Sequence, residues 1–392
     1  MNDSASKDVE LSPIELGRRL TTDVLAAMKG AFVGKDEVID LLGVSLVAGE
    51  NLFILGPPGT AKSALVQDLA TRLHGQVFDY LLTRFTEPNE LFGPFDIRKL
   101  REGELVTNTE GMLPEASLVF LDELLNANSA ILNSLLLVLN ERVFRRGRET
   151  RNLPLVMVVG ASNRLPEDDA LGALFDRFLL RVRCDNVHDD RLGEVLSAGW
   201  RLAQSQFHDK VTVDVEAIRR LQRFLYDVDL SAVRPLYVEL VHRLRRAGIP
   251  VSDRRAVKLQ RLLAASAVLC GRATVSRTDL WVLRYIWDTD EQREIVAAIV
   301  QDAVNKADES ERATAHPRAH GGATPDPEEL ARELDRIASR AGEGSLSAAD
   351  HAILRDQLGL LASRCAWVSN EQARLHLDAQ VNQLWQRLEI RP

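Results

Sequence analysis

The stretch Gly56-Pro57-Pro58-Gly59-Thr60-Ala61-Lys62-Ser63 decides the fold of this chain. It follows residues 51–55, a short apolar run typical of a buried strand, and precedes residues 64–70, whose apolar positions recur at helical spacing. A glycine-rich loop that joins a strand to a helix and ends in Lys-Ser is the sequence context of a phosphate-binding loop. The backbone N–H groups of such a loop, with the positive end of the helix that starts near Ala64, bind anionic phosphates.

Two side chains of this loop have the chemistry of a nucleotide site. Lys62 is placed to reach the β and γ phosphates, and the hydroxyl of Ser63 is placed to bind Mg²⁺. Ala61 stands where such loops usually have glycine, so we expect that this position does not need a strongly left-handed backbone. The alternative is a Gly-Pro turn that happens to precede Lys-Ser, and the predicted strand and helix on either side argue against it.

Composition narrows the class of protein. The 392 residues suffice for two or three domains, and the hydrophobic share of 45% is ordinary for a globular protein in water. The net charge of -8 and the lack of a long apolar run argue against a nucleic-acid partner and against membrane insertion. The polar N-terminus does not resemble a signal peptide, and the three cysteines lie far apart. We therefore expect a cytoplasmic protein with reduced thiols.

Polar side chains follow two further apolar runs. Residues 118–121 lead into Asp122 and Glu123, and residues 155–161 lead into a segment that contains Asn163. Because ligands of an open α/β sheet bind at the carboxyl ends of its strands, Asp122 is a candidate Mg²⁺ ligand. Glu123 is a candidate base or positioning group for the water that attacks the γ-phosphate, and Asn163 could hold that water. The alternatives are a charged helix cap and an asparagine that bonds to its own turn.

Arginines in two later segments complete the candidate set. Arg177 is always charged and planar, which suits the charge that develops on a transferring phosphoryl group. Its alternative role is a structural ion pair with a nearby acid. A helix that begins at Ser252 carries Arg254 and Arg255, either of which could reach back to the nucleotide.

The spacing of apolar residues predicts an α/β protein with a parallel sheet, followed by an all-α lid and a short helical C-terminal segment. Two short alternating pieces around Arg101-Glu102-Gly103 predict a β-hairpin that is inserted into the sheet domain. The predicted divisions are a flexible tail (1–10), an αβα core (11–186) with the hairpin insert (93–112), a helical lid (187–306), a polar linker (307–327) and a helical segment (328–392).

These features together resemble the AAA+ ATPases, within them the MoxR group, and most of all its RavA branch. The resemblance covers roughly residues 14–290 and lies in seven ordered blocks. The blocks are GPPGTAKS (56–63), YLLTRFTEPNELFGP (80–94), GMLPEASLVFLDE (111–123), AILNSLLLVLNER (130–142), GASNRLPE (160–167), ALFDRF (173–178) and VSDRR (251–255).

The resemblance implies a role for each candidate residue. Residues 56–64 would bind ATP, with Ser63 and Asp122 holding Mg²⁺ and Asp122 and Glu123 forming the Walker B pair. Asn163 would be sensor 1 and Arg254 sensor 2. Arg177, with Arg181 as the alternative, would be the finger that completes the site of a neighbouring subunit. The tail 328–392 departs from the family, whose larger members carry an extended helical arm with a β-module.

The resemblance also implies an activity: ATP hydrolysis in a hexameric ring that remodels a client protein. Members of this group typically work with a protein that carries a von Willebrand factor A domain. Two alternatives stay open. One is a nucleotide-gated scaffold with little turnover, and the other is a DNA-directed ATPase with a helix-2 insert, for which the chain lacks the expected basic tracts.

Overall fold

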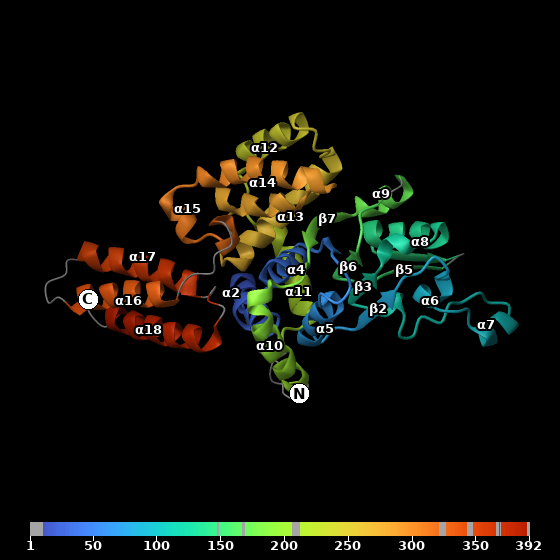
Figure 1. Cartoon of the computed structure of the whole chain (residues 1–392), viewed down its shortest axis with the longest axis horizontal. Coiled ribbons are helices and arrows are strands. Elements are labelled where there is room, and N and C mark those ends of the chain that lie inside the picture. The colour runs from blue at the N-terminus through green and yellow to red at the C-terminus, as the bar shows by residue number, and fades with distance from the viewer. Residues whose placement is uncertain are drawn as a thin grey trace.

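The structure is a computed structural model, and it describes residues 11–146, 149–166, 169–205, 212–320, 327–342, 348–365, 368 and 370–389. The expected tail at residues 1–10 lies outside this part of the chain. Figure 1 shows three regions: a body that contains the sheet, a group of helices above it, and a three-helix bundle at one end.

A five-stranded parallel sheet forms the centre of the body, in the order β2-β3-β6-β1-β7. Its strands are β1 (Asn51–Leu55), β2 (Val77–Leu81), β3 (Leu118–Asp122), β6 (Met157–Ser162) and β7 (Phe178–Arg183). β1 is fully buried between β6 and β7, as its continuous apolar sequence predicts. Helix α4 (Asp36–Ala48) packs against β1 and β7, whereas α5 (Lys62–Arg72) packs against β2 and β3. The predicted α/β class with a parallel sheet is therefore confirmed.

The chain enters the body through three consecutive helical segments, α2 (Pro13–Arg19), the π-helix η1 (Leu20–Leu25) and α3 (Ala26–Ala31). Ser12 begins α2 with a capping box. Its hydroxyl accepts from the backbone N–H of Glu15, and the Glu15 carboxylate accepts from the backbone N–H of Ser12. A π-helical turn places one extra residue in the helix. Within it, the Thr21 hydroxyl donates to the carbonyl of Leu269, 3.0 Å away in the lid.

The insert at residues 93–112 differs from the predicted β-hairpin. A short helix, α7 (Ile97–Arg101), stands where the first strand was expected, and the two arms meet only at the bridge between Phe95 and Thr107. The strand prediction was wrong because Asp96 caps the helix by accepting from two backbone N–H groups. Gly103, with φ of 83°, then ends the helix in a left-handed turn.

The base of the insert is fixed to the hairpin of β4 (Val143–Arg146) and β5 (Glu149–Asn152). The Arg146 guanidinium lies 3.9 Å from the centre of the Phe95 ring and donates to the carbonyl of Gly93 at 2.7 Å. The tip, by contrast, has no buried residue in α7 and exposes Ile97 and Leu100 at 67% and 52%. The insert is thus anchored at its base and presents apolar side chains at its end.

Helices dominate the chain after β7. They are α10 (Leu192–Ser205), α11 (Val215–Phe224), α12 (Arg234–Arg246), α13 (Asp253–Leu269), the 3₁₀ helix η6 (Arg277–Tyr285) and α14 (Asp290–Asn305). The apolar faces of α11, α12, α13, η6 and α14 join the hydrophobic core of the sheet rather than forming a second one, whereas α10 packs Leu202 against its margin. Trp281 is fully buried there, and its indole N–H donates to the hydroxyl of Ser266 at 3.0 Å.

Residues 307–320, predicted as part of a polar linker, are instead folded against the body. They form α15 (Glu309–Ala313) and η7 (Pro317–His320), and the intervening His316 is 1% exposed and stacks on Trp281. The linker prediction was wrong here because these polar side chains have partners that are distant in sequence. Residues 321–326 of the predicted linker lie outside the described residues.

The buried carboxylate of Asp40 is the main partner of this segment. Asp40 lies in α4, 2.5 Å from the Lys29 ammonium and 2.5 Å from Nε of Arg318. Burial on its own would raise the pKa of Asp40, but the charges of Lys29, His316 and Arg318 outweigh it and hold the pKa well below its usual range. One ionised carboxylate thus joins α3, α4 and η7.

The C-terminal bundle consists of α16 (Pro327–Gly342), α17 (Ala348–Cys365) and α18 (Glu371–Glu389), each of which contacts the other two. Leucines such as Leu334, Leu358 and Leu384 form a core that is separate from the core of the body. Trp385 packs at the edge of this core, and Trp367, which was expected to join it, lies outside the described residues. In the described part of the chain, every helix is too short or too polar to cross a membrane.

Candidate active site

The phosphate loop begins at the carboxyl end of β1, and its first residue contacts the ends of the two adjacent strands, β6 and β7. The backbone N–H of Gly56 donates to the carbonyl of Ser162, the last residue of β6, at 3.0 Å. On the other side, a Cβ at Gly56 would lie 2.3 Å from the carbonyl oxygen of Cys184. Only glycine fits this approach, so the turn after β1 is fixed by the two adjacent strands.

Ala61 has a left-handed backbone, with φ of 69° and ψ of 22°, and the expectation that this position avoids such a backbone was wrong. The residue stands at the N-cap of α5, where the chain must turn sharply from the loop into the helix. No side chain caps this helix, so its first N–H groups have no acceptor within the helix and remain available to an anion. Alanine adopts this conformation at a cost of about 1–2 kcal/mol.

The Lys62 side chain lies over the loop that precedes it. It is 6% exposed, and its ammonium donates to the carbonyls of Gly56 and Pro57 at 2.9 and 2.8 Å. The Thr60 hydroxyl also donates to Pro57, at 3.0 Å, which tightens the loop. Ser63 follows in the first turn of α5, so the lysine and the serine both lie at the start of this helix.

Asp122 and Glu123 lie at the same edge of the sheet as the loop. Asp122 ends β3, and its carboxylate accepts from the backbone N–H of Glu123 at 2.9 Å. Burial raises the pKa of Glu123, and the charge of Asp122 adds to the effect, whereas the charges of Lys62 and Arg164 oppose it. Lys62 and Asp122 are therefore both near enough to influence the carboxylate of Glu123.

Asn163 is the first residue after β6 and is exposed at this same edge. Its neighbour Arg164, which the sequence reasoning missed, donates to the amide oxygen of Asn126 at 3.3 Å. Asn126 in turn donates to Glu123 at 3.4 Å. The sequence feature that could have predicted Arg164 is its position directly after Asn163, because a cation at that point would face the carboxylates at the end of β3.

Arg177 lies at the opposite edge of the sheet. Its carbonyl accepts from the side-chain amide of Asn51, the first residue of β1, at 2.9 Å, whereas the phosphate loop follows the last residue of β1. β1 has 5 residues, so the two edges are roughly 16 Å apart. The Arg177 guanidinium pairs with Asp176 at 2.9 Å, and it cannot contribute to the phosphate loop of its own chain.

Arg254 lies with Arg177 and not with the phosphate loop. The two arginines line one small crevice, in which Arg254 donates to the amide oxygen of Asn140 at 3.0 Å. Arg254 therefore lies away from the phosphate loop of its own chain, and its contact with a nucleotide stays a prediction. The reason is the position of α13, whose Lys258 pairs at 3.1 Å with Glu50, the residue just before β1.

Arg181 and Arg255 are structural. Arg181 is 0% exposed, and both guanidinium groups pair with the carboxylate of Asp288, at 2.9 and 3.1 Å. Burial, together with repulsion from Arg255, lowers the pKa of Arg181 to about 9. Arg181 could meet another subunit only by leaving these contacts and its buried bonds to the carbonyls of Ile286 and Phe175, so the geometry favours Arg177 over Arg181 as the finger.

This geometry agrees with the family to which the sequence can be matched. Residues 18–223, more than half of the chain, match the MoxR domain of the MoxR-vWA-beta-propeller ternary systems. The chain belongs to the MoxR family of AAA+ ATPases. Residues 233–300 of this MoxR protein also match an AAA lid domain, which accounts for the helices that follow the sheet.

Relatives of this MoxR protein occur in archaea and bacteria. Two uncharacterized proteins of Methanocaldococcus jannaschii are 35% and 36% identical to it, over 70% and 65% of this chain and 72% and 68% of their own lengths. Chaperone MoxR1 of Mycobacterium tuberculosis is 26% identical over 50% of this chain and 51% of its own. Among solved structures, a candidate ATPase from Cytophaga hutchinsonii superimposes with a TM-score of 0.60 at 19% identity. That alignment covers 76% of this chain and 96% of the other and shows a shared fold.

The backbone of Ala61 generates a test of stability. Ala61→Gly should raise the free energy of unfolding by about 0.5–1 kcal/mol. Glycine adopts the left-handed conformation without strain, and this gain is partly offset because glycine has more conformational entropy to lose from the unfolded chain. Urea denaturation without nucleotide would measure it. Ala64→Gly, inside α5, is the matched control and should lower the free energy of unfolding by about 1 kcal/mol. Equal destabilisation by both variants would contradict the assignment of strain to Ala61.

Proposed function

We propose that this MoxR protein hydrolyses ATP at the edge of the sheet that holds the phosphate loop, Asp122 and Glu123. The observation that carries the proposal is the shared electrostatic site of Lys62, Asp122 and Glu123 at the carboxyl ends of β1 and β3. A phosphate chain would rest on the N–H groups of the loop and of the first turn of α5. Lys62 would then exchange its two loop carbonyls for phosphate oxygens.

The same edge fits a magnesium ion, since the Ser63 hydroxyl and the Asp122 carboxylate are hard oxygen donors beside the loop. Bound Mg²⁺ would neutralise charge on the phosphates. Glu123 would orient the attacking water and accept its proton, and a raised pKa brings the carboxylate closer to the working pH of a general base. Asn163, exposed beside it, would hold the water or the γ-phosphate.

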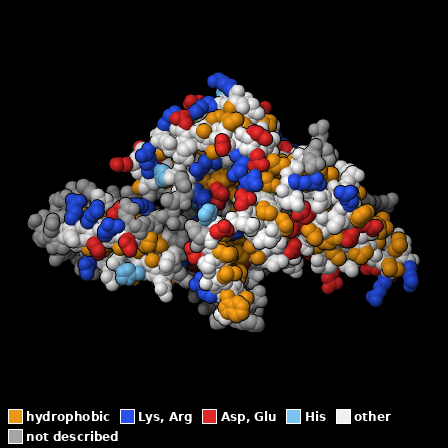
Figure 2. Space-filling model, viewed as in Figure 1, with side chains coloured by type: hydrophobic (Ala, Val, Ile, Leu, Met, Phe, Trp, Pro, Cys, Tyr) orange, Lys and Arg blue, Asp and Glu red, His pale blue; other side chains and the backbone are white. Residues whose placement is uncertain are grey.

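A ring of subunits, hexameric by the family resemblance, would complete each site. Arg177 and Arg254 share a crevice at the edge opposite the phosphate loop, which supports a role at the nucleotide of a neighbour rather than at their own. An apolar stripe on α10 supports such contacts: Leu192, Leu196 and Trp200, spaced four residues apart, are 54%, 66% and 72% exposed. Figure 2 shows apolar side chains gathered over this helix.

The ring would remodel a client protein in the manner of a chaperone, in a cytoplasmic setting. The name of MoxR1 supports the chaperone role, and the name of the matched domain family supports a partner with a von Willebrand factor A domain. The anchored insert with its exposed apolar tip is the candidate contact for that partner or client. Closeness to the RavA branch stays a prediction.

Two alternative functions have their own tests. A scaffold with little turnover would be favoured if no phosphate release is measured. A DNA-directed ATPase would be favoured if DNA stimulates ATP hydrolysis.

Glu123→Gln tests the chemistry. This variant should bind ATP like the parent, because Lys62, Ser63 and Asp122 are unchanged, while steady-state phosphate release should fall by roughly two orders of magnitude or more. Glu141→Gln, at the far end of α8 (Ser129–Glu141), is a control that should retain activity. Turnover in Glu123→Gln equal to that of the parent would remove Glu123 from the mechanism.

Mixed rings test the role of Arg177. Arg177→Ala alone and Lys62→Ala alone should each be inactive, but a mixture should recover part of the ATPase rate, because an intact phosphate loop then meets an intact arginine. Phosphate release should be followed as the ratio of the two variants changes, with ring formation checked by native mass spectrometry. Mixed rings without any recovery would contradict the role of Arg177 at the site of a neighbouring subunit.

Replacement of Lys99, Leu100 and Arg101 by Gly-Ser-Gly tests the insert. The change removes most of α7 but none of the contacts at the base, so assembly and basal ATPase rate should persist. Capture of a von Willebrand factor A protein encoded nearby, or its stimulation of the ATPase, should be lost. If capture and stimulation are unchanged, the insert is not the docking element.

A further inference from the structure

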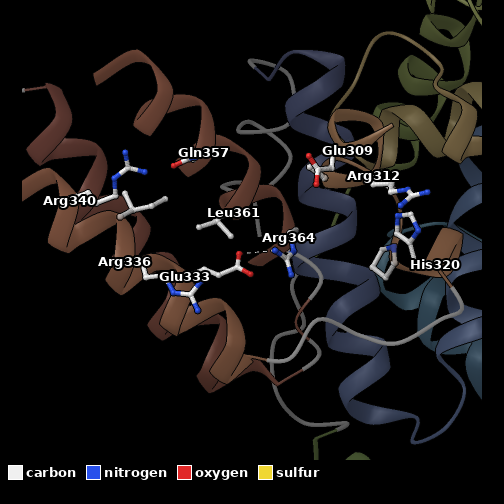
Figure 3. Close-up of a pocket in the computed structure, with 13 residues that line it drawn as sticks. Glu309, Arg312, His320, Glu333, Arg336, Arg340, Gln357, Leu361 and Arg364 are labelled. Carbon is white, nitrogen blue, oxygen red and sulfur yellow. Dashed lines mark hydrogen bonds and ion pairs between the residues drawn. The ribbon is translucent and has the colours of Figure 1, made fainter. Parts of the chain in front are cut away.

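A cavity of about 720 Å³ lies between the body and the C-terminal bundle, far from the phosphate loop. One wall is formed by α15 and η7, the segment held to the body by His316 and Arg318, and the facing wall is formed by α16 and α17. Figure 3 shows Glu309, Arg312 and His320 on the first wall, opposite side chains of the bundle. This volume is within the range of ligand-binding pockets.

Arginines dominate the charged groups of the cavity. Four of them, Arg312, Arg336, Arg340 and Arg364, accompany two carboxylates, Glu309 and Glu333. Arg364 pairs with Glu333 at 2.8 Å, so one of these carboxylates is already neutralised within the bundle. The cavity therefore carries a local positive charge on a chain whose net charge is -8.

Two of these arginines have no partner among the described residues. Arg336 and Arg340 are one helical turn apart on α16 and both are exposed, and neither has an ion pair or hydrogen bond within the part of the chain that the structure describes. Like charges four residues apart on a helix repel each other. An anion in the cavity would relieve that repulsion and accept bidentate hydrogen bonds from both guanidinium groups.

The floor of the cavity is apolar. Ala315 and Pro317 contribute from one wall, and Ile337 and Leu361, which belong to the core of the bundle, contribute from the other. A bare phosphate group would leave this floor exposed to water. A ligand that suits both features has carboxylates for the arginines and an apolar side chain for the floor.

We propose that this cavity binds an acidic peptide segment of a partner protein, with a large apolar side chain seated on Ile337 and Leu361 and with flanking carboxylates paired to Arg336 and Arg340. A polypeptide is the occupant because it presents both groups along one backbone. The bundle also lies at the end of the molecule, where a second protein has access without covering the sheet (Figure 1). Because the two walls belong to different cores, a bound peptide would bridge the bundle and the body.

The test uses the full chain and a fluorescein-labelled peptide, Glu-Asp-Glu-Leu-Phe-Asp-Glu-Asp. Fluorescence anisotropy should show saturable binding that weakens as salt rises from 50 to 200 mM, because the contacts are charged. Arg336→Glu with Arg340→Glu should weaken binding roughly tenfold or more, because each reversal replaces an attraction with a repulsion. Both side chains are exposed and have no partner in the part of the chain that the structure describes, so the variant should fold, which circular dichroism would verify.

Three controls make the result specific. Arg355→Glu with Arg387→Glu makes the same change of charge on exposed residues of the bundle outside the cavity and should leave binding unchanged. A peptide with Ser-Ser in place of Leu-Phe should bind much more weakly, since it lacks the group for the floor. The rate of ATP hydrolysis, measured in the same samples without peptide, should not change in either charge-reversed variant, which separates this proposal from the proposed function.

Several outcomes would overturn the proposal. They are absence of binding, equal weakening by both pairs of substitutions, and binding of the Ser-Ser peptide as tight as that of the Leu-Phe peptide. Complete displacement by millimolar inorganic phosphate at constant ionic strength would identify a site for small anions instead of a peptide.

Discussion

The turn from β1 into α5 is the constraint on which the rest of the structure depends. Gly56 brings the loop against the Cys184 carbonyl, and its N–H is fixed to the end of β6, so three strands hold the turn in place. Ala61 then takes a strained backbone so that α5 can begin at Lys62. Strain of this kind persists only where surrounding contacts determine it, and next to Ala61 the thiol of Cys184, just after β7, donates to the carbonyl of Thr60 at 3.3 Å.

Parallel pairing also divides the candidate residues into two groups. All strands end at the edge that holds the phosphate loop, Asp122, Glu123 and Asn163, and all begin at the edge that holds Arg177. Helix α13 follows the second edge because Lys258 and Arg261 pair with the buried Glu50, at 3.1 and 3.2 Å. These ion pairs, together with the packing of α13 against α4, hold Arg254 at the second edge.

The sequence predicted the features that depend on neighbouring residues. The strands, the phosphate loop and the carboxylates after β3 follow from short apolar runs and from the residues that end them, so their relative placement was predictable. The backbone of Ala61 was not, because the loop beside it is held by Cys184, which is distant in sequence. Residues 307–320 were predicted as a linker because the partner of His316 and Arg318 is Asp40, which is almost three hundred positions away in the sequence. Arg164 was missed because its role depends on Asn126, on another strand connection.

The separate core of the C-terminal bundle has a consequence for how this protein can change over generations. Its leucines, from Leu330 to Leu388, form a cluster that is separate from the hydrophobic core of the body. A substitution in either core therefore needs no compensating substitution in the other. Lineages can rebuild or exchange the bundle while the nucleotide-handling body is inherited intact, so this end of the molecule is free to diversify among relatives that keep the same sheet and lid.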